Sequence, residues 1–104
     1  MAVKVNADCF ESEVLSAEEV VLVDFYSDSC VPCKRIAPLL SQIEQENESI
    51  KLAKLNINFD QETAKAYGVT AVPTLVLFKG GKEKGRLVGS VKKETIEEAI
   101  NSID

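Results

Sequence analysis

Two cysteines separated by two residues, Cys30 and Cys33, are the side chains in this sequence best suited to chemistry. They follow an apolar run that ends at Tyr26, and they precede a segment with helical periodicity. A pair with this spacing can bind a metal, form a static crosslink or exchange electrons with another disulfide. These three functions make different demands on the rest of the chain.

Metal binding and a static crosslink both fit the composition poorly. Structural zinc takes four ligands, usually thiolates and imidazoles, whereas the chain has no histidine and only one further cysteine, Cys9. Carboxylates or a second chain would have to complete a metal site. The hydrophobic fraction of 45% is high enough for a core that needs no disulfide to hold it together.

Electron exchange fits the surroundings of the pair better. Cys30 ends a loop that leaves a strand, and Pro32 and Cys33 open a helix, where a proline is well tolerated. The free N–H groups and the partial positive charge at the amino end of a helix favour a thiolate at Cys30. Lowering a thiol pKa from about 8.5 to about 7 raises the thiolate fraction at neutral pH roughly fifteen-fold. Cys33 can then attack a mixed disulfide formed on Cys30.

Hydrophobic periodicity predicts the elements that must hold this pair. Pro38 is expected to kink the second helix, Gly68 to end the third, and Gly80-Gly81 to join the last two strands in a hairpin. The order βαβαβαββα predicts an α/β fold, with helices on both faces of a mixed sheet. The expected strands cover residues 3–5, 20–26, 50–57, 74–78 and 86–91. The first expected helix begins at a cap at Asn6 or Asp8 and ends at residue 15. The other expected helices cover residues 32–48, 60–67 and 93–103.

The composition is that of one ordinary globular domain, expected to span residues 1–104. A net charge of −5 disfavours nucleic-acid binding, and the basic residues between positions 79 and 93 are expected to be solvated. The first residues lack the pattern of a secretory signal. The longest apolar run, residues 20–23, is too short to cross a bilayer. We therefore expect a cytoplasmic monomer that does not attach to a membrane.

The segment from Val20 to Pro38 resembles the active-site strand, loop and helix of thioredoxins, whose usual motif reads W-C-G-P-C-K. A lone C-x-x-C is a moderate signal, but here C-x-P-C follows a buried-strand pattern and precedes V-P-T by about 40 residues. The resemblance implies a thioredoxin fold, in which four helices flank a central mixed five-stranded sheet. It covers essentially the whole chain, including residues 53–57, Tyr67-Gly68-Val69, Val72-Pro73-Thr74-Leu75, residues 78–81 and Val88-Gly89.

The resemblance assigns roles to four residues. Cys30 would be the attacking nucleophile and Cys33 the resolving cysteine. Asp24, which interrupts an apolar run, would be a buried acid with a raised pKa that takes the proton from Cys33. Lys54 would moderate the charge of Asp24. The alternatives are an Asp24 at a strand end facing water and a Lys54 that extends along the surface to solvent.

The resemblance also implies a surface for target proteins. A cis Val72–Pro73 peptide bond would leave the Val72 backbone free to pair with an extended target segment. Gly89 and Tyr26 are expected to belong to the same surface. The alternatives are a trans proline at a strand edge and a Gly89 that serves only as a bulge.

The active-site loop of Ser29, Val31 and Pro32 departs from the family motif. Ser29 stands where the family usually has tryptophan, and Val31 replaces the usual glycine. These changes bear on the reduction potential, the substrate preference and the choice of reductase. Asp28 is expected to place a solvated negative charge near Cys30. Cys9 is expected to pack as a small hydrophobe, with a regulatory or dimer-forming thiol as the alternative.

The function that the resemblance implies is thiol–disulfide oxidoreduction. The Cys30–Cys33 dithiol would reduce disulfides in target proteins, and a thioredoxin reductase would restore it. The two sulfurs would carry the electrons, so neither a bound cofactor nor a metal is expected. The alternatives are a non-catalytic binding module, a redox partner of narrow specificity, and a metal or iron–sulfur site shared across a dimer.

Overall fold

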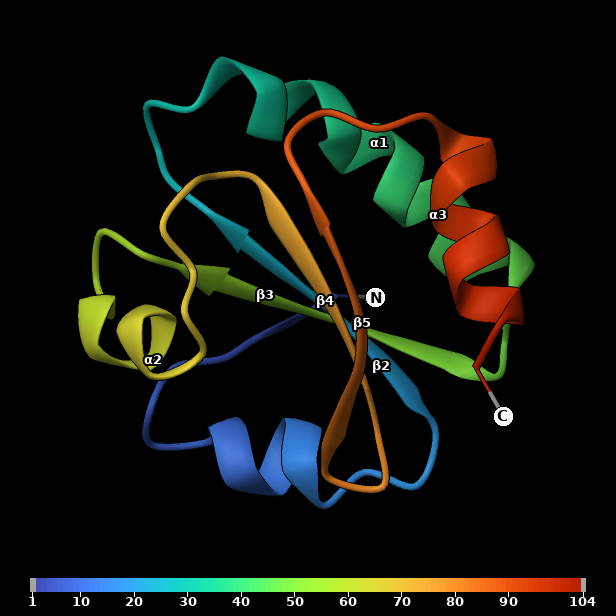
Figure 1. Ribbon diagram of the computed structural model, residues 1–104, viewed down its shortest axis with the longest axis horizontal. Coiled ribbons are helices and arrows are strands. Elements are labelled where there is room, and N and C mark those ends of the chain that lie inside the picture. The colour runs from blue at the N-terminus through green and yellow to red at the C-terminus, as the bar shows by residue number, and fades with distance from the viewer. Residues whose placement is uncertain (1, 104) are drawn as a thin grey trace.

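The computed structural model describes residues 2–103, in which five strands and four helices follow one another in the predicted order (Figure 1). The strands are β1 (Val3–Lys4), β2 (Val20–Tyr26), β3 (Ile50–Asn56), β4 (Thr74–Lys79) and β5 (Lys82–Val88). The helices are η1 (Glu11–Leu15), α1 (Val31–Glu46), α2 (Gln61–Ala66) and α3 (Lys93–Asn101).

The strands form one mixed sheet in the order β1-β3-β2-β4-β5. Strands β1 and β2 run parallel to β3, whereas β4 is antiparallel to both β2 and β5. The parallel pairs are joined through helical connections, and the hairpin β4–β5 turns at Gly80 and Gly81, whose φ angles are +62° and +80°. The predicted mixed five-stranded sheet, flanked by helices in an α/β fold, is confirmed.

Two hydrophobic cores cover the two faces of the sheet. Helices α1 and α3 lie on one face, and η1 and α2 lie on the other (Figure 1). Alternate residues of β2 enter opposite cores, as the period-two geometry of a strand requires. Val21, Val23 and Phe25 pack on the side of η1 and α2, and Leu22 packs on the side of α1 and α3. Asp24 shares the face of Leu22, so it lies under α1.

The predicted end of the third helix at Gly68 is confirmed, whereas the predicted cap of the first helix is not. Asp60 caps α2 by accepting a 3.0 Å hydrogen bond from the Thr63 N–H, and Gly68 ends this helix with a φ of +68°. The Asn6 side chain instead accepts the Asp8 N–H at 2.9 Å, a local turn that competes with helix capping. The first helix is therefore only the π-helical segment Glu11–Leu15, and the prediction of a cap at Asn6 or Asp8 was wrong.

The last strand is displaced from its predicted position. β5 covers Lys82–Val88 rather than residues 86–91. Its first three residues are exposed and charged, because β5 is an edge strand whose pairing with β4 does not require apolar side chains. Gly89 follows directly in the left-handed region, with a φ of +87°, and ends the strand. Pro38 lies inside α1, which continues unbroken to Glu46.

We expect Gly81→Ala to destabilise the protein by about 1–3 kcal/mol, because alanine is strained at a φ of +80°. Its Cβ would also lie 3.1 Å from the Leu15 carbonyl oxygen. Urea unfolding measures the change. Gly85→Ala is the matched control, since its Cβ would meet only Leu77 Cδ1 at an ordinary 3.8 Å. Equal unfolding midpoints for the two variants would contradict this account of the hairpin.

Candidate active site

The two cysteines of the motif are joined as a disulfide at the amino end of α1. Cys30 is the N-cap residue, with Pro32 in the first turn, and the Cα atoms of Cys30 and Cys33 lie 5.2 Å apart. The Cys33 N–H donates a 3.1 Å hydrogen bond to Cys30 Sγ. The first turn of α1, which the structure describes completely, contains no acidic side chain to offset the helix dipole. A thiolate formed at Cys30 would therefore meet a favourable field.

Asp24 is buried under α1 with an unpaired carboxylate oxygen. The residue is only 1% exposed, and its Oδ1 has no hydrogen-bond partner among the described residues. Burial raises the pKa of Asp24 from 3.8 to about 6, although the charge of Lys54 works in the opposite direction. The alternative of an Asp24 that faces water at a strand end is therefore wrong.

Asp24 and Cys33 line the same small pocket, whose volume of about 200 Å³ is enough for several water molecules. The pocket reaches the surface beside Lys34 and Lys54. Asp24 and Cys33 therefore border one shared cavity. The remaining wall is formed by Tyr26, Ser27, Asp28 and Ala37.

Lys54 lies beside Asp24 because the two residues are in register on the parallel strands β2 and β3. Its side chain is half-buried, and Nζ lies 5.8 Å from the centroid of the Tyr26 ring. The ammonium is close enough to lower the pKa of Asp24, which burial raises more strongly. Burial also raises the pKa of Tyr26, with smaller contributions from Asp28 and Asp24.

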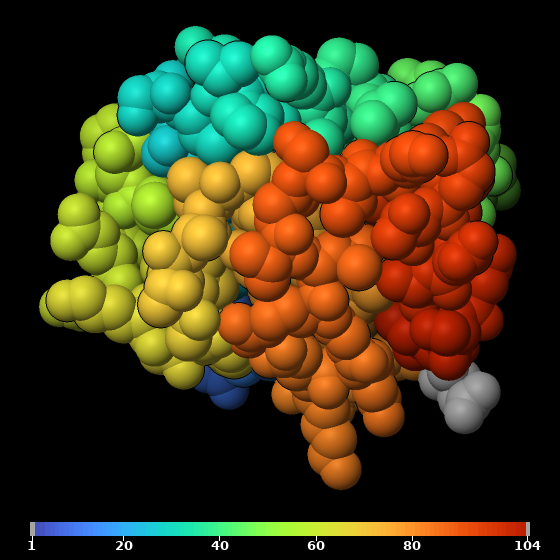
Figure 2. Space-filling view, turned by 45° about the horizontal axis from the view of Figure 1, so that its top comes forward, coloured from blue at the N-terminus to red at the C-terminus, as the bar shows by residue number. Residues whose placement is uncertain are grey.

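The predicted cis peptide bond between Val72 and Pro73 is present. The Pro73 carbonyl accepts a 2.8 Å hydrogen bond from the Gly89 N–H. This bond brings the loop before β4 together with the loop after β5, and both lie beside the start of α1 (Figure 2). Through this hydrogen bond, Gly89 links the loop after β5 to the loop before β4.

The surface around the pair carries exposed apolar side chains. Val31 is 54% exposed and Val88 60% exposed, and Val72 is half-buried. Ser29, in the usual position of tryptophan, is exposed and Pro32 half-buried. The face therefore offers aliphatic contacts and no indole.

The sequence analysis did not identify three residues near this face as candidate site residues, namely Asn56, Asn58 and Phe59. Phe59 is 83% exposed, and the only sequence signal for it was an aromatic residue inside a polar turn. Asn56 and Asn58 both hydrogen bond to Asp28. The expectation that Asp28 is merely solvated was therefore incomplete.

Cys9 lies away from the motif. It is half-buried and free, it packs against the core beneath η1, and its Sγ lies 3.9 Å from both the Lys4 carbonyl and Asn6 Oδ1. Within residues 2–103, no three cysteine or acidic side chains form a group that could hold a metal ion. None of the described helices combines the length and the apolar character needed to span a bilayer.

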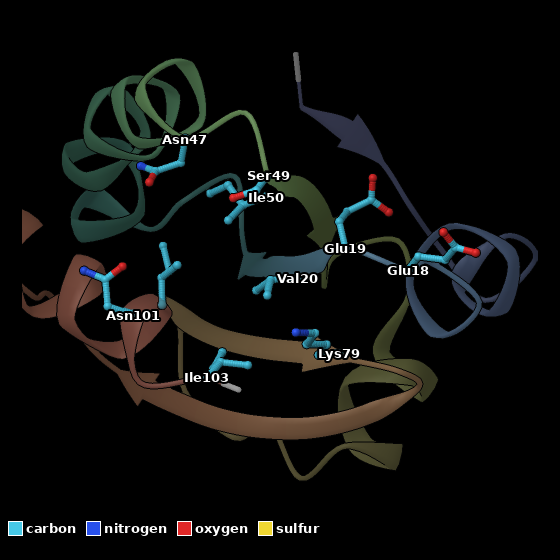
Figure 3. A pocket seen from close by; sticks show the side chains of 10 residues that line it. Glu18, Glu19, Val20, Asn47, Ser49, Ile50, Lys79, Asn101 and Ile103 are labelled. Carbon is cyan, nitrogen blue, oxygen red and sulfur yellow. The ribbon is translucent and has the colours of Figure 1, made fainter.

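A larger pocket of about 610 Å³ lies at the other end of the sheet, where β2 and β3 begin (Figure 3). Its polar side chains do not converge. The carboxylates of Glu18 and Glu19 point away from the Lys79 ammonium, and Asn47 and Asn101 lie across the opening (Figure 3). This pocket contains neither a thiol nor a buried acid.

Comparison with known proteins agrees with this geometry. The family model described as Thioredoxin matches residues 1–102. The chain is 39% identical over 103 residues to "Thioredoxin" of Rickettsia bellii, covering 98% of each chain. It is 38% identical over 100 residues to "Thioredoxin 1" of Nostoc sp., covering 95% of this chain and 94% of the relative. It is 41% identical over 97 residues to "Thioredoxin" of Chlamydia caviae, covering 93% of each.

The burial of Asp24 predicts how stability depends on pH. The folded state raises the pKa of Asp24 from 3.8 to about 6, so the favourable contribution of the protonated form is complete below pH 3.8 and is lost as the pH rises through 6. We expect Asp24→Asn to increase the free energy of unfolding by up to about 3 kcal/mol above pH 7, and by little near pH 4. Urea unfolding of the oxidised protein at both pH values measures this.

Asp60→Asn is the control, because the folded state lowers the pKa of Asp60 whereas it raises that of Asp24. Burial works to raise the pKa of Asp60, but hydrogen bonds from the Thr63 N–H and hydroxyl outweigh it and lower that pKa. The Asp60 variant should therefore lose stability at neutral pH and not at low pH. A gain from Asp24→Asn that is the same at pH 4 and pH 8 would refute the raised pKa.

Proposed function

The chain belongs to the thioredoxin family of thiol–disulfide oxidoreductases, and we propose that it reduces disulfides in target proteins by cycling the Cys30–Cys33 pair between dithiol and disulfide. One observation carries the proposal: the disulfide lies at the amino end of α1, and Cys33 shares a pocket with the buried Asp24. In the proposal, a thioredoxin reductase restores the dithiol. The two sulfurs carry both electrons without a bound cofactor, in a cytoplasmic monomer of one domain.

In the first step, the Cys30 thiolate attacks one sulfur of the target disulfide. A bond forms between Cys30 Sγ and that sulfur, the target S–S bond breaks, and the other target sulfur leaves as a thiolate. The 3.1 Å hydrogen bond from the Cys33 N–H to Cys30 Sγ supports this assignment, because a donor aimed at the sulfur favours its ionised form.

In the second step, Asp24 accepts the proton of the Cys33 thiol, and the resulting thiolate attacks Cys30 Sγ. The Cys30–Cys33 disulfide forms, and the second target sulfur leaves as a thiolate. The target gains two electrons and the cysteine pair loses two. A carboxylate with a pKa of about 6 is suited to this role, since it is mostly ionised at neutral pH and still able to hold a proton.

Target recognition in this proposal uses the face beside Cys30. The backbone of Val72 would pair with an extended segment of the target, as a short added strand. Val31 and Val88, which are more than half exposed, would contact apolar side chains on either side of the target cysteine. Lys54, which lines the same pocket, would moderate the proton affinity of Asp24 through its positive charge.

Cysteine variants test the enzyme function. We expect wild type to catalyse insulin reduction by dithiothreitol, and both Cys30→Ser and Cys33→Ser to lose this activity. The two variants fail at different steps, so only Cys33→Ser should accumulate a mixed disulfide with insulin, detectable by mass spectrometry. Equal activity in all three proteins would exclude the proposed chemistry and favour a binding module.

Asp24→Asn tests the proton acceptor. Reduced protein mixed with 5,5′-dithiobis(2-nitrobenzoate) releases one thionitrobenzoate when Cys30 attacks and a second when Cys33 resolves the adduct. We expect the variant to slow the second release roughly ten- to hundred-fold at pH 7, because it lacks the general base. The first release should keep its rate. An unchanged second release would remove Asp24 from the mechanism.

A further inference from the structure

The turn that carries Cys30 is tied to a distant loop by hydrogen bonds. The Cys30 N–H donates to the Ser27 carbonyl at 3.4 Å, so Asp28 and Ser29 are the central residues of a tight turn. The Asp28 N–H donates to Asn58 Oδ1 at 2.8 Å. The Asp28 carboxylate accepts from Asn56 Nδ2 at 2.9 Å. Asp28 is therefore held by both its backbone and its side chain.

The sheet brings these segments together. Strands β2 and β3 are parallel neighbours with Tyr26 and Asn56 in register. Their carboxyl ends therefore lie side by side at the same end of the sheet (Figure 1). The Ile57 N–H donates to the Tyr26 carbonyl at 2.8 Å and continues the pairing one residue beyond the strands. The turn and the loop after β3 thus begin from a common, rigid base.

The side-chain amide of Asn56 is oriented by its own contacts. Its Nδ2 donates to Asp28, and its Oδ1 accepts the Asn58 N–H at 3.0 Å. A reversed amide would place oxygen against oxygen and nitrogen against an N–H, losing both bonds. Asn56 is therefore a fixed support for the turn.

We infer that Asn56 and Asn58 are positioning residues for the reaction, acting on Cys30 through Asp28. The inference rests on the proposed function, in which Cys30 makes the first attack. The residue just before Cys30 is Ser29, whose small side chain is exposed. The polar contacts of Asp28 therefore hold Cys30 at the amino end of α1, where its sulfur accepts the Cys33 N–H.

This role is distinguishable from an effect of the Asp28 charge, because the two have opposite signs. A negative charge near Cys30 disfavours the thiolate, so removing the charge alone would speed the reactions of Cys30 at neutral pH. Removing the support lets the sulfur leave the helix end, which slows them. Asp28→Asn removes the charge but keeps a side-chain oxygen for Asn56, whereas Asp28→Ala removes both.

The experiment measures the alkylation rate of Cys30 by iodoacetamide in the reduced full-length protein, across a pH range, with the modified residue identified by peptide mass spectrometry. We expect Asp28→Ala to react about two- to ten-fold more slowly than Asp28→Asn at pH 7, the factor that one hydrogen bond of ordinary net strength provides. Asn58→Ala, which leaves the Asp28 charge in place, should also slow Cys30.

Two controls separate positioning from general loss of stability. Asn47→Ala loses a comparable 2.9 Å hydrogen bond from its side chain to the Ile43 carbonyl at the far end of α1. It should lower the urea midpoint and leave the alkylation of Cys30 unchanged. In an Asn56→Ala background, Asp28→Ala and Asp28→Asn should react at the same rate, because the partner of the side-chain oxygen is gone.

The inference is overturned if Asp28→Ala and Asp28→Asn react equally in the wild-type background, or if their difference persists without Asn56. It is also overturned if Asn47→Ala slows Cys30 as much as Asn58→Ala does. These results differ from failure of the proposed function, which would appear as a wild-type Cys30 that neither reacts first nor reduces insulin.

Discussion

Strand β2 and helix α1 are separated only by residues 27–30, and this short connection governs the whole site. It obliges the helix to begin close to the carboxyl end of β2, the central strand, with Cys30 as its N-cap and Cys33 buried in its first turn. The Cys33 N–H of this first turn then donates to the sulfur of Cys30. A longer connection would separate the helix end from the strand that supports it.

The position of Asp24 in β2 explains why its carboxylate is buried under α1. Alternation along β2 directs Asp24 toward α1, into the space beneath Cys33. A hydrophobic residue there would pack without an unpaired polar atom, so Asp24 costs stability at neutral pH. Protein sites commonly retain such a cost where a proton must be exchanged away from bulk water. Lys54, in register on β3, limits the cost without removing it.

The surface around Cys30 is assembled from loops that are far apart in the sequence but lie at the same end of the sheet. The loop after β3 holds the turn that carries Cys30, through hydrogen bonds that span 28 and 30 residues of sequence. The loops at Pro73 and Gly89 are joined by one backbone hydrogen bond. These hydrogen bonds connect the loops of this face to one another and to the end of the sheet.

The sequence by itself determined the order of the elements, the fold class and the glycine end of α2, because these follow from local periodicity and backbone preference. Through the C-x-x-C spacing, the sequence also identified the two cysteines that form the disulfide. It also indicated that Asp24 is unusual, since the residue interrupts a buried run. Only the tertiary structure decided the bounds of β5, the reduction of the first helix to η1, and the partners of Asp28. An edge strand, a competing local turn and a hydrogen bond between distant residues leave no periodic trace in the sequence, because each depends on what the folded chain places beside it.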